Sequence, residues 1–364
     1  MKPEAPIEKI EPRVFRIPTE TPEADGTLDW NATTMLLVTA AAGGATGMGY
    51  SYSGASAAAV VSGKLAEAVR GVDAMDTPRA WIMMVRSVRN LGWPGIAACA
   101  ISAVDAALWD LKAKLLNVSL VALLGAERSS VPIYGSGGFT DYDDARLREQ
   151  LCRWVGPDGC RAVKMKVGRE PSRDMERVRQ ARSAIGEAEL YVDANGALTR
   201  KQALAYAEVW RQFGVTWFEE PVSSDDLEGL RLLRDRAPAV IDIVAGEYGY
   251  QPFYFRRMLE AGSVDIIQAD ATRCGGITGF MRAAALADAF MLPLSTHTAP
   301  ALHLHAACAA PRIKNMEWFY DHVRIEGMLF DGAPVPHDGA IGPDLSRPGL
   351  GLSCKEADAR PFAV

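Results

Sequence analysis

The sequence predicts an α/β protein whose main part is a closed barrel of alternating β and α units, with a separate α+β region before it. From Val131 onward, short β-rich runs alternate with longer amphipathic segments such as SRDMERVRQARSAI. The eight runs are VPIYGSG, AVKMKVG, ELYVDAN, VTWFEEP, DIVAGE, VDIIQAD, MLPLST and KNMEWF. Consecutive units of this kind form a parallel sheet, and eight of them close the sheet into a barrel.

The region before Val131 lacks this alternation. Its segments IEKIEPRVFRI and TTMLLVTAAAGGATGMGYSYS predict strands of an antiparallel sheet joined at glycine turns. Helical patterns follow over residues 56–89, and residues 96–116 carry apolar side chains at three- and four-residue steps, which predicts a long helix joining two domains. From about Gly332 the chain is rich in Pro and Gly and is expected to fold back onto the N-terminal region. We therefore divide the chain into residues 1–130, 131–331 and 332–364.

Composition and charge exclude several classes of protein. The net charge of −6 argues against nucleic acid as a partner, because phosphate binding requires a basic surface. No segment reaches 18 uninterrupted apolar residues, so no membrane span is expected, and the charged start MKPEAPIEKIEPRVF lacks a signal-peptide pattern. The six cysteines form no CxxC pair, which suits a reducing compartment. We expect a cytoplasmic protein.

Familiar catalytic motifs are also missing. GGATGMG is expected to form a hairpin turn, because its glycines do not follow the order of the dinucleotide-binding fingerprint. The sequence contains no GxSxG and no HExxH, which argues against a serine hydrolase and against the common zinc enzymes. His303 and His305 lie in a helix-like stretch and are expected to be structural.

Three acidic residues, Asp193, Glu219 and Glu247, each close one of the predicted strands. In a barrel of this kind the chemistry lies at the carboxyl ends of the strands, so the three carboxylates should share one rim. An all-oxygen set selects a hard cation, Mg²⁺ or alternatively Mn²⁺. Because Trp217 and Glu219 share a strand face, Glu219 is the expected ligand. The adjacent Glu220 is a candidate for a residue that orients the ligands without binding the cation itself.

Five further residues close or precede the ends of other strands. Lys164 and Lys166 share a strand face, and two ammonium groups beside a divalent cation should push one lysine toward its neutral, basic form. His297 could be a second base, oriented by Asp270 one strand earlier. Two bases beside a metal-bound carboxylate indicate removal of the proton on the carbon α to that carboxylate, through an enediolate. Glu317 could donate a hydrogen bond to the enediolate if its pKa is raised.

These residues resemble those of the enolase superfamily, specifically its mandelate racemase subgroup. The resemblance covers nearly the whole chain and includes AVDAALWDLKAKLLNVSLVALLGA, VKMKVG, YVDANG, WFEEP, AGE, QAD, STH and MEW. Glu247 as third ligand, together with Asp270 and His297, distinguishes the chain from the muconate lactonizing subgroup. The resemblance implies a modified TIM barrel, (β/α)7β, under an N-terminal α+β capping domain to which the last segment returns.

The resemblance also implies residue roles. Asp193, Glu219 and Glu247 would bind Mg²⁺, Lys166 and His297 would be opposing bases, and Asp270 would orient His297. Lys164 would neutralise the substrate carboxylate, Glu317 would bond its other oxygen, and Asn195 matches a position that touches the substrate α-hydroxyl. Specificity would lie in cap loops, here residues 18–29 and the SYSGAS segment.

The expected function is that of an acid-sugar dehydratase, which converts a small-molecule sugar carboxylate into a 2-keto-3-deoxy acid. The alternative is a racemase or epimerase of a 2-hydroxy acid, in which Lys166 and His297 act in turn on opposite faces of one carbon. Both readings use the same residues, and the family resemblance implies a homo-oligomer.

Overall fold

The alternating β-rich runs all form strands in the computed structural model, which describes residues 4–364. The barrel strands are β4 (Val131–Gly137), β5 (Ala162–Lys166), β6 (Glu189–Asp193), β7 (Val215–Glu219), β8 (Asp242–Ala245), β9 (Ile266–Ala269), β10 (Leu294–Thr296) and β11 (Ile313–Phe319). Each strand is parallel to the next, and pairing of β11 with β4 closes the barrel. The predicted modified TIM barrel is therefore confirmed.

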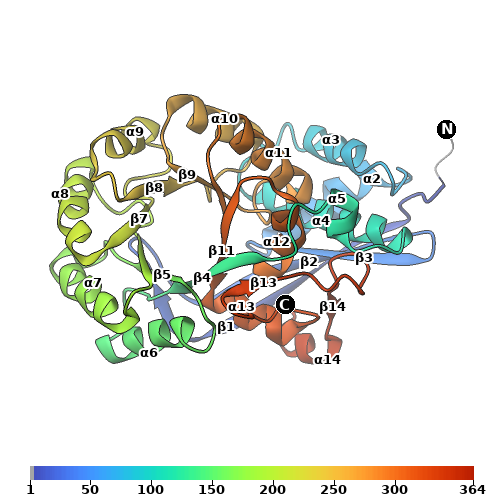
Figure 1. Ribbon diagram of the computed structural model, residues 1–364. Coiled ribbons are helices and arrows are strands. Elements are labelled where there is room, and N and C mark those ends of the chain that lie inside the picture. The colour runs from blue at the N-terminus through green and yellow to red at the C-terminus, as the bar shows by residue number, and fades with distance from the viewer. Residues whose placement is uncertain (1–3) are drawn as a thin grey trace.

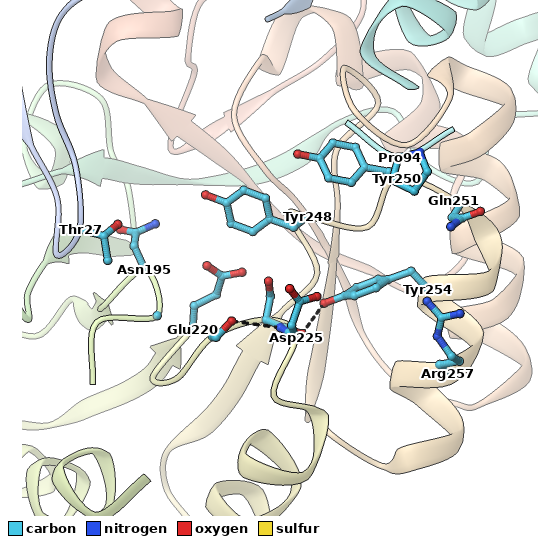
Figure 2. Close-up of a pocket in the computed structure, with 13 residues that line it drawn as sticks. Thr27, Pro94, Asn195, Glu220, Asp225, Tyr248, Tyr250, Gln251, Tyr254 and Arg257 are labelled. Carbon is cyan, nitrogen blue, oxygen red and sulfur yellow. Dashed lines mark hydrogen bonds between the residues drawn. The ribbon is translucent and has the colours of Figure 1, made fainter. Parts of the chain in front are cut away.

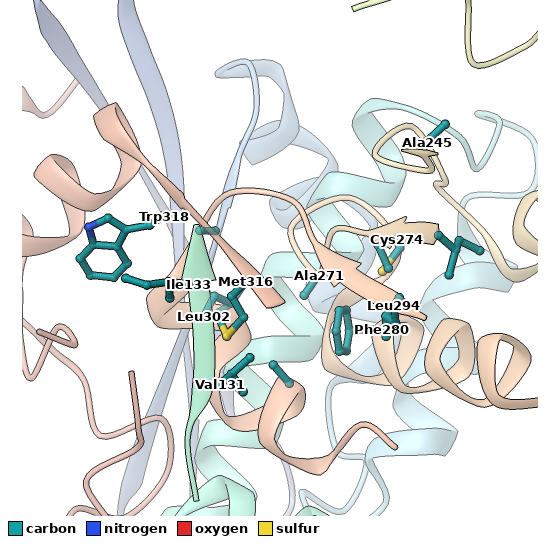
Figure 3. Packing of buried hydrophobic residues seen from close by; sticks show 14 of the residues in the cluster. Val131, Ile133, Ala245, Ala271, Cys274, Phe280, Leu294, Leu302, Met316 and Trp318 are labelled. Carbon is teal, nitrogen blue, oxygen red and sulfur yellow. The ribbon is translucent and has the colours of Figure 1, made fainter. Parts of the chain in front are cut away.

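Helices follow the strands and surround them (Figure 1). They are α6 (Asp144–Val155), α7 (Pro171–Ile185), α8 (Arg200–Trp210), α9 (Leu227–Arg236), α10 (Pro252–Ala261), α11 (Gly276–Ala289), α12 (Pro300–Ala309) and, after the last strand, α13 (Tyr320–Leu329). Apolar side chains fill the space between strands and helices. Figure 3 shows Leu294 and Met316 of the barrel in one buried cluster with Phe280 of α11 and Leu302 of α12.

The inside of the barrel is layered. Its lower layer is apolar and aromatic, with Tyr191 and Trp217 stacked at 4.7 Å between ring centroids. Successive inward side chains on a strand are two residues apart, so the next layer up contains Asp193 on β6 and Glu219 on β7. The period of the strands therefore places acidic side chains directly above a water-excluding aromatic floor.

The N-terminal region is an antiparallel sheet with helices packed against it, as predicted. Its elements are β1 (Lys9–Ala24), β2 (Asp29–Ala42), β3 (Ala45–Tyr52), α1 (Ser56–Val60), a π-helical turn (Val61–Leu65), α2 (Ala66–Val69), α3 (Thr77–Ser87), α4 (Ile96–Leu115) and α5 (Leu120–Leu124). In GGATGMG, Gly43 and Gly44 make the expected hairpin turn with φ of 56° and 76°. At position 47 close packing requires glycine, because a Cβ there would lie 2.3 Å from the Ala107 carbonyl oxygen of α4.

Helix α4 joins this sheet to the barrel. The carboxylate of Asp105 accepts hydrogen bonds from the backbone N–H of Thr278 and from its hydroxyl, which caps the start of α11. Asp110 accepts from the backbone N–H of Met48 in β3 and from that of Leu350 in the C-terminal segment, both at 2.7 Å. Two buried aspartates on one helix thus connect three parts of the chain that are distant in sequence.

The segment after Gly332 contacts both the barrel and the N-terminal sheet. Strand β13 (Ala340–Ile341) pairs with β4, and β14 (Ser353–Cys354) pairs with β12 (Phe330–Asp331), before α14 (Glu356–Ala359). The backbone N–H of Val364 then bonds the carbonyl of Val14 at 3.1 Å. Within the described part of the chain, no helix has both the length and the apolar character that crossing a bilayer requires.

Candidate active site

The structure brings the predicted site residues together at the carboxyl ends of the barrel strands. The eight side chains are all buried, with at most 7% of any residue exposed: Lys164, Lys166, Asp193, Glu219, Glu247, Asp270, His297 and Glu317. Lys166, Asp193 and Glu219 are the last residues of β5, β6 and β7. Because parallel strands end at one rim, side chains separated by more than one hundred residues in the sequence share one small volume.

Three carboxylates form the centre of this cluster. One oxygen each from Asp193, Glu219 and Glu247 lies within 4.8 Å of the others. Burial and the neighbouring charge of Asp193 raise the pKa of Glu219 well above its usual range. Among the residues that the structure describes, Oε2 of Glu247 is buried without a hydrogen-bond partner. Buried, mutually repelling oxygen donors with an unsatisfied oxygen fit a divalent cation, and an all-oxygen set fits Mg²⁺.

The two lysines pair with these carboxylates. Nζ of Lys166 lies 2.5 Å from Oδ2 of Asp193, and Nζ of Lys164 contacts Oε1 of Glu219 and also lies 2.8 Å from Oε1 of Glu317. Burial acts to lower both lysine pKa values, but the surrounding carboxylates outweigh it and raise both above the usual range. The same carboxylates are the expected cation ligands, so the expectation that a divalent cation pushes one lysine toward its neutral form stays a prediction.

His297 is held by Asp270. Its Nδ1 lies 2.7 Å from Oδ2 of Asp270, and its Nε2 lies 3.3 Å from Oε2 of Glu247. Burial acts to raise the pKa of Asp270, but the bond from His297 outweighs it and the pKa falls below the usual range. An ionised Asp270 keeps the proton of a neutral imidazole on Nδ1, so Nε2 is free to accept a proton at the carboxylate cluster.

Two further residues support this pair. His303 is fully buried, and its Nε2 accepts from the backbone N–H of Ala271 directly after Asp270. Arg273 lies 3.5 Å from Asp270 and 3.2 Å from Glu247, so one guanidinium contacts both carboxylates. The sequence analysis missed Arg273, although a cation three residues after Asp270 is a visible signal.

Glu317 is also tightly held. Its Oε1 accepts from the Ser136 hydroxyl at 2.6 Å, and its Oε2 accepts from the backbone N–H of Thr298 at 2.7 Å. Burial acts to raise the pKa of Glu317, but the charge of Lys164 outweighs it and lowers the pKa. The ion pair with Lys164 favours an ionised Glu317, and the expectation that Glu317 donates a hydrogen bond to the enediolate stays a prediction.

Asn195 and Glu220 line a cavity beside the carboxylate centre. Both have positive φ, 45° and 36°, which is uncommon for these residues and turns each side chain sideways at a strand end. Oδ1 of Asn195 and Oε1 of Glu220 are buried and, within residues 4–364, have no hydrogen-bond partner. Trp217 donates to Glu219 at 2.9 Å inside the barrel, so Glu219 is the inward residue of the pair, as the strand period predicts.

The cavity has a volume of about 620 Å³ (Figure 2). The capping region supplies Thr27 and Pro94, and the barrel supplies the rest of the lining, including three tyrosines after the third carboxylate. These are Tyr248, Tyr250 and Tyr254. The sequence analysis missed them, and the available signal was the aromatic cluster EYGYQPFYF directly after AGE.

Both cap segments expected to set specificity contact the barrel rim. A Cβ at Gly26 would lie 2.4 Å from the Ala194 carbonyl oxygen, so the turn after β1 sits directly on the loop that follows Asp193. In the SYSGAS segment, Tyr52 stacks on His322 at 3.4 Å between ring centroids. The Ser51 hydroxyl donates to the carbonyl of Thr272, two residues after Asp270.

Comparison with known proteins places both halves of the chain in one group. Residues 11–125 match the family described as mandelate racemase/muconate lactonizing enzyme, N-terminal domain, and residues 146–358 match the enolase C-terminal domain-like family. A 3,6-anhydro-alpha-L-galactonate cycloisomerase from Streptomyces coelicolor is 34% identical over 322 residues, 85% of this chain and 88% of the relative. An L-talarate/galactarate dehydratase from Salmonella typhimurium is 32% identical over 87% of this chain and 79% of its own.

Solved structures agree. A mandelate racemase/muconate lactonizing enzyme-like protein from Rubrobacter xylanophilus superposes with a TM-score of 0.96 at 50% identity, covering 99% of this chain and 100% of that one. A racemase from Streptomyces coelicolor with bound magnesium superposes with a TM-score of 0.92 at 32% identity, over 98% and 100% of the two chains.

Proposed function

The chain belongs to the mandelate racemase/muconate lactonizing enzyme family of the enolase superfamily, and from this premise we propose that it is a Mg²⁺-dependent acid-sugar dehydratase. One observation carries the proposal. The amine of Lys166 and the imidazole of the His297–Asp270 pair both reach the three-carboxylate centre, from β5 and from the end of β10. A substrate carboxylate bound there would present its α-carbon to two proton-transfer groups.

Lys164 and the residues around it bind the substrate carboxylate. Lys164 neutralises one carboxylate oxygen, and Glu317 bonds the other, which requires Glu317 to be protonated when substrate is bound. Asn195 contacts the α-hydroxyl with its unpartnered Oδ1. When bound to Asp193, Glu219 and Glu247, Mg²⁺ supplies positive charge to the substrate carboxylate and opposes protonation of the neighbouring lysines.

The proposed reaction breaks one C–H bond and one C–O bond. Lys166, as the free amine, accepts the α-proton. The electron pair of that C–H bond stays on the α-carbon and forms the C2–C3 double bond when the β-hydroxyl leaves. Protonated His297 gives its Nε2 proton to the β-hydroxyl, which leaves as water. The resulting enol loses its C2 hydroxyl proton to solvent, takes up a solvent proton at C3 and becomes the 2-keto-3-deoxy acid. Asp270 holds the ring of His297 through both proton transfers.

The names of relatives support dehydration. Besides the talarate/galactarate dehydratase, they include an arabinonate dehydratase from Saccharolobus solfataricus at 29% identity and an L-rhamnonate dehydratase from Saccharopolyspora erythraea at 31% identity, over 76% and 90% of this chain. These enzymes share an acid-sugar substrate and loss of water, which is the reaction that we propose.

A racemase or epimerase is the second candidate. Lys166 and the His297–Asp270 pair come from strands on different sides of the barrel, which is the arrangement that removal and return of a proton on opposite faces requires. A related solved structure is described as a racemase.

Proton NMR in D₂O separates the two candidates. The enzyme with Mg²⁺ is mixed with a panel of mono- and diacid sugars and of smaller 2-hydroxy acids. Loss of a substrate with appearance of 3-deoxy-2-keto signals is the expected result. Deuterium at the α-carbon with an inverted isomer and no keto product would replace the dehydratase by the racemase.

We further propose that the protein acts as a homo-oligomer in the cytoplasm without a nucleic-acid partner, and that residues 1–130, 131–331 and 332–364 are its capping domain, its barrel and a returning segment. The six free cysteines and the net charge of −6 support the location and the choice of partners.

A further inference from the structure

The cavity beside the carboxylate centre extends outward along one side of the barrel rim. It begins at Asn195, Glu220 and Tyr248, which are two, one and one residues after Asp193, Glu219 and Glu247. Figure 2 shows Tyr254 and Arg257 of α10 on the side of the cavity opposite Thr27 and Asn195. A substrate bound at the carboxylate centre therefore has a defined direction in which its remaining carbons can extend.

The lining is suited to a hydroxylated chain. Oε1 of Glu220 is buried without a partner among the described residues, and Glu220 as a whole is only 1% exposed. An unpartnered buried acceptor is costly unless a ligand donates to it, and sugar hydroxyls are donors. Tyr254 is held in place because its hydroxyl donates to the Ser224 carbonyl at 2.8 Å. Pockets of roughly 300–1,000 Å³ commonly hold small organic ligands, and this one is about 620 Å³.

Arg257 gives the outer end of the cavity a positive charge. Among residues 4–364 no carboxylate lies within 4.0 Å of its guanidinium, whereas the neighbouring Arg256 pairs with Glu260 at 3.6 Å. Asp225 lines the cavity between Glu220 and Arg257, and its carboxylate would accept from a hydroxyl and repel a second anion (Figure 2). An anionic group of the substrate is therefore favoured at Arg257 and disfavoured beside Asp225.

We propose that this cavity is a distal subsite for a diacid sugar, in which Arg257 binds the second carboxylate and Glu220 accepts from a hydroxyl of the intervening chain. The inference rests on the proposed dehydratase function and makes it more specific. A guanidinium can bind a carboxylate through two parallel N–H donors, which discriminates a diacid from the monoacid that ends in an uncharged hydroxymethyl group.

The test compares six-carbon diacid sugars with the monoacid sugars of the same configuration. Arg257→Gln is expected to raise KM for a reacting diacid by roughly 10- to 100-fold, because it removes a charge-assisted contact, and to change KM for the matched monoacid less than about threefold. Arg256→Gln is the control, since Arg256 is one residue away on the same helix and already has a partner. It should leave both substrates unchanged.

Two results would overturn the subsite while leaving the dehydratase proposal intact. One is an equal change in KM for diacid and monoacid in Arg257→Gln, and the other is a change no larger than that in Arg256→Gln. Failure of every acid sugar to react or to exchange its α-proton with the unmodified enzyme would instead overturn the proposed function itself. Thermal unfolding of both variants checks that neither substitution acts by loosening α10.

Discussion

The Asp270 carboxylate lies 2.7 Å from Nδ1 of His297 across two neighbouring strand ends, and the opposite ring nitrogen lies 3.3 Å from Glu247. This contact determines which nitrogen of His297 faces the carboxylate centre. Asp270 thus acts through the imidazole of His297 on the chemistry at the opposite ring nitrogen. The predictions on catalysis follow from this geometry and from the lysine on β5.

His297→Asn should abolish dehydration, because it removes the side chain that gives a proton to the departing β-hydroxyl. Asp270→Asn should lower kcat by about 10²–10⁴-fold, since the ring loses the acceptor that fixes its tautomer. Both are measured by keto-acid formation. His337→Asn is the matched control, because the His337 side chain is 91% exposed and should retain full activity. A fully active His297→Asn enzyme would remove this residue from the mechanism.

Lys166→Ala should also abolish turnover, and it should do so without loss of the fold. The substitution removes the amine that lies 2.5 Å from Asp193. Deuterium incorporation at the substrate α-carbon in D₂O reports proton removal even where no product forms, and we expect that incorporation to stop. Continued exchange at the normal rate would show that another group takes the proton.

Exhaustive chelation should abolish activity, and Mg²⁺ should restore it. Glu247→Gln should weaken Mg²⁺ binding at least tenfold, as measured by calorimetry, because one of three anionic ligands is lost. Glu187→Gln, at an exposed position before β6, is the control and should bind Mg²⁺ as the parent does. Activity that survives chelation would contradict the assignment of the three carboxylates.

Gly26→Ala should impair the enzyme without unfolding it. A methyl group at Gly26 would lie 2.4 Å from the Ala194 carbonyl oxygen and 2.8 Å from that of Val167, so the turn must lift from the rim. We expect kcat/KM to fall by about tenfold or more, since misplacement of a substrate-covering loop is costly. Gly63→Ala is the control, because a methyl group there meets no described atom within 4 Å. Equal kinetics in the two variants would show that the turn does not cover the substrate.

His305 should make the fold sensitive to mild acid. Burial lowers the pKa of His305 to about 4 from its usual 6.5, and its ring bonds the N–H of Val121 and the carbonyl of Leu350. The unfolded chain therefore binds more protons between pH 6.5 and 4, and stability falls as pH falls through that window. The slope approaches about 1.4 kcal/mol per pH unit. Urea unfolding at several pH values should show a shallower slope for His305→Gln.

The barrel and the carboxylate centre could be predicted from the sequence because both follow local rules. Short β-rich runs that alternate with longer amphipathic segments indicated the strands. The two-residue period of a strand distinguished Glu219 from Glu220. Strand ends of a parallel barrel meet at one rim whatever lies between them. Asp193, Glu219 and Glu247 could therefore be grouped without any knowledge of their distances.

The ion pair of Lys164 and Glu317 could not be predicted in this way. It joins β5 to β11, two strands that are distant in sequence. Arg257 escaped prediction for a related reason. Its value as a cation rests on the lack of a nearby carboxylate, whereas Arg256 beside it has one. A sequence shows that two arginines are present and does not show which of them is paired.

The two backbone donors that bond Asp110 are synthesised at different times. Its bond to Met48 joins residues 62 apart in the sequence, whereas its bond to Leu350 spans 240 residues. At typical synthesis rates of about 5–20 residues per second, the second partner emerges roughly 12–48 s after Asp110 itself. During that interval Oδ1 of Asp110 lacks this donor, so the N-terminal sheet and α4 reach their final stability only after Leu350 has left the ribosome.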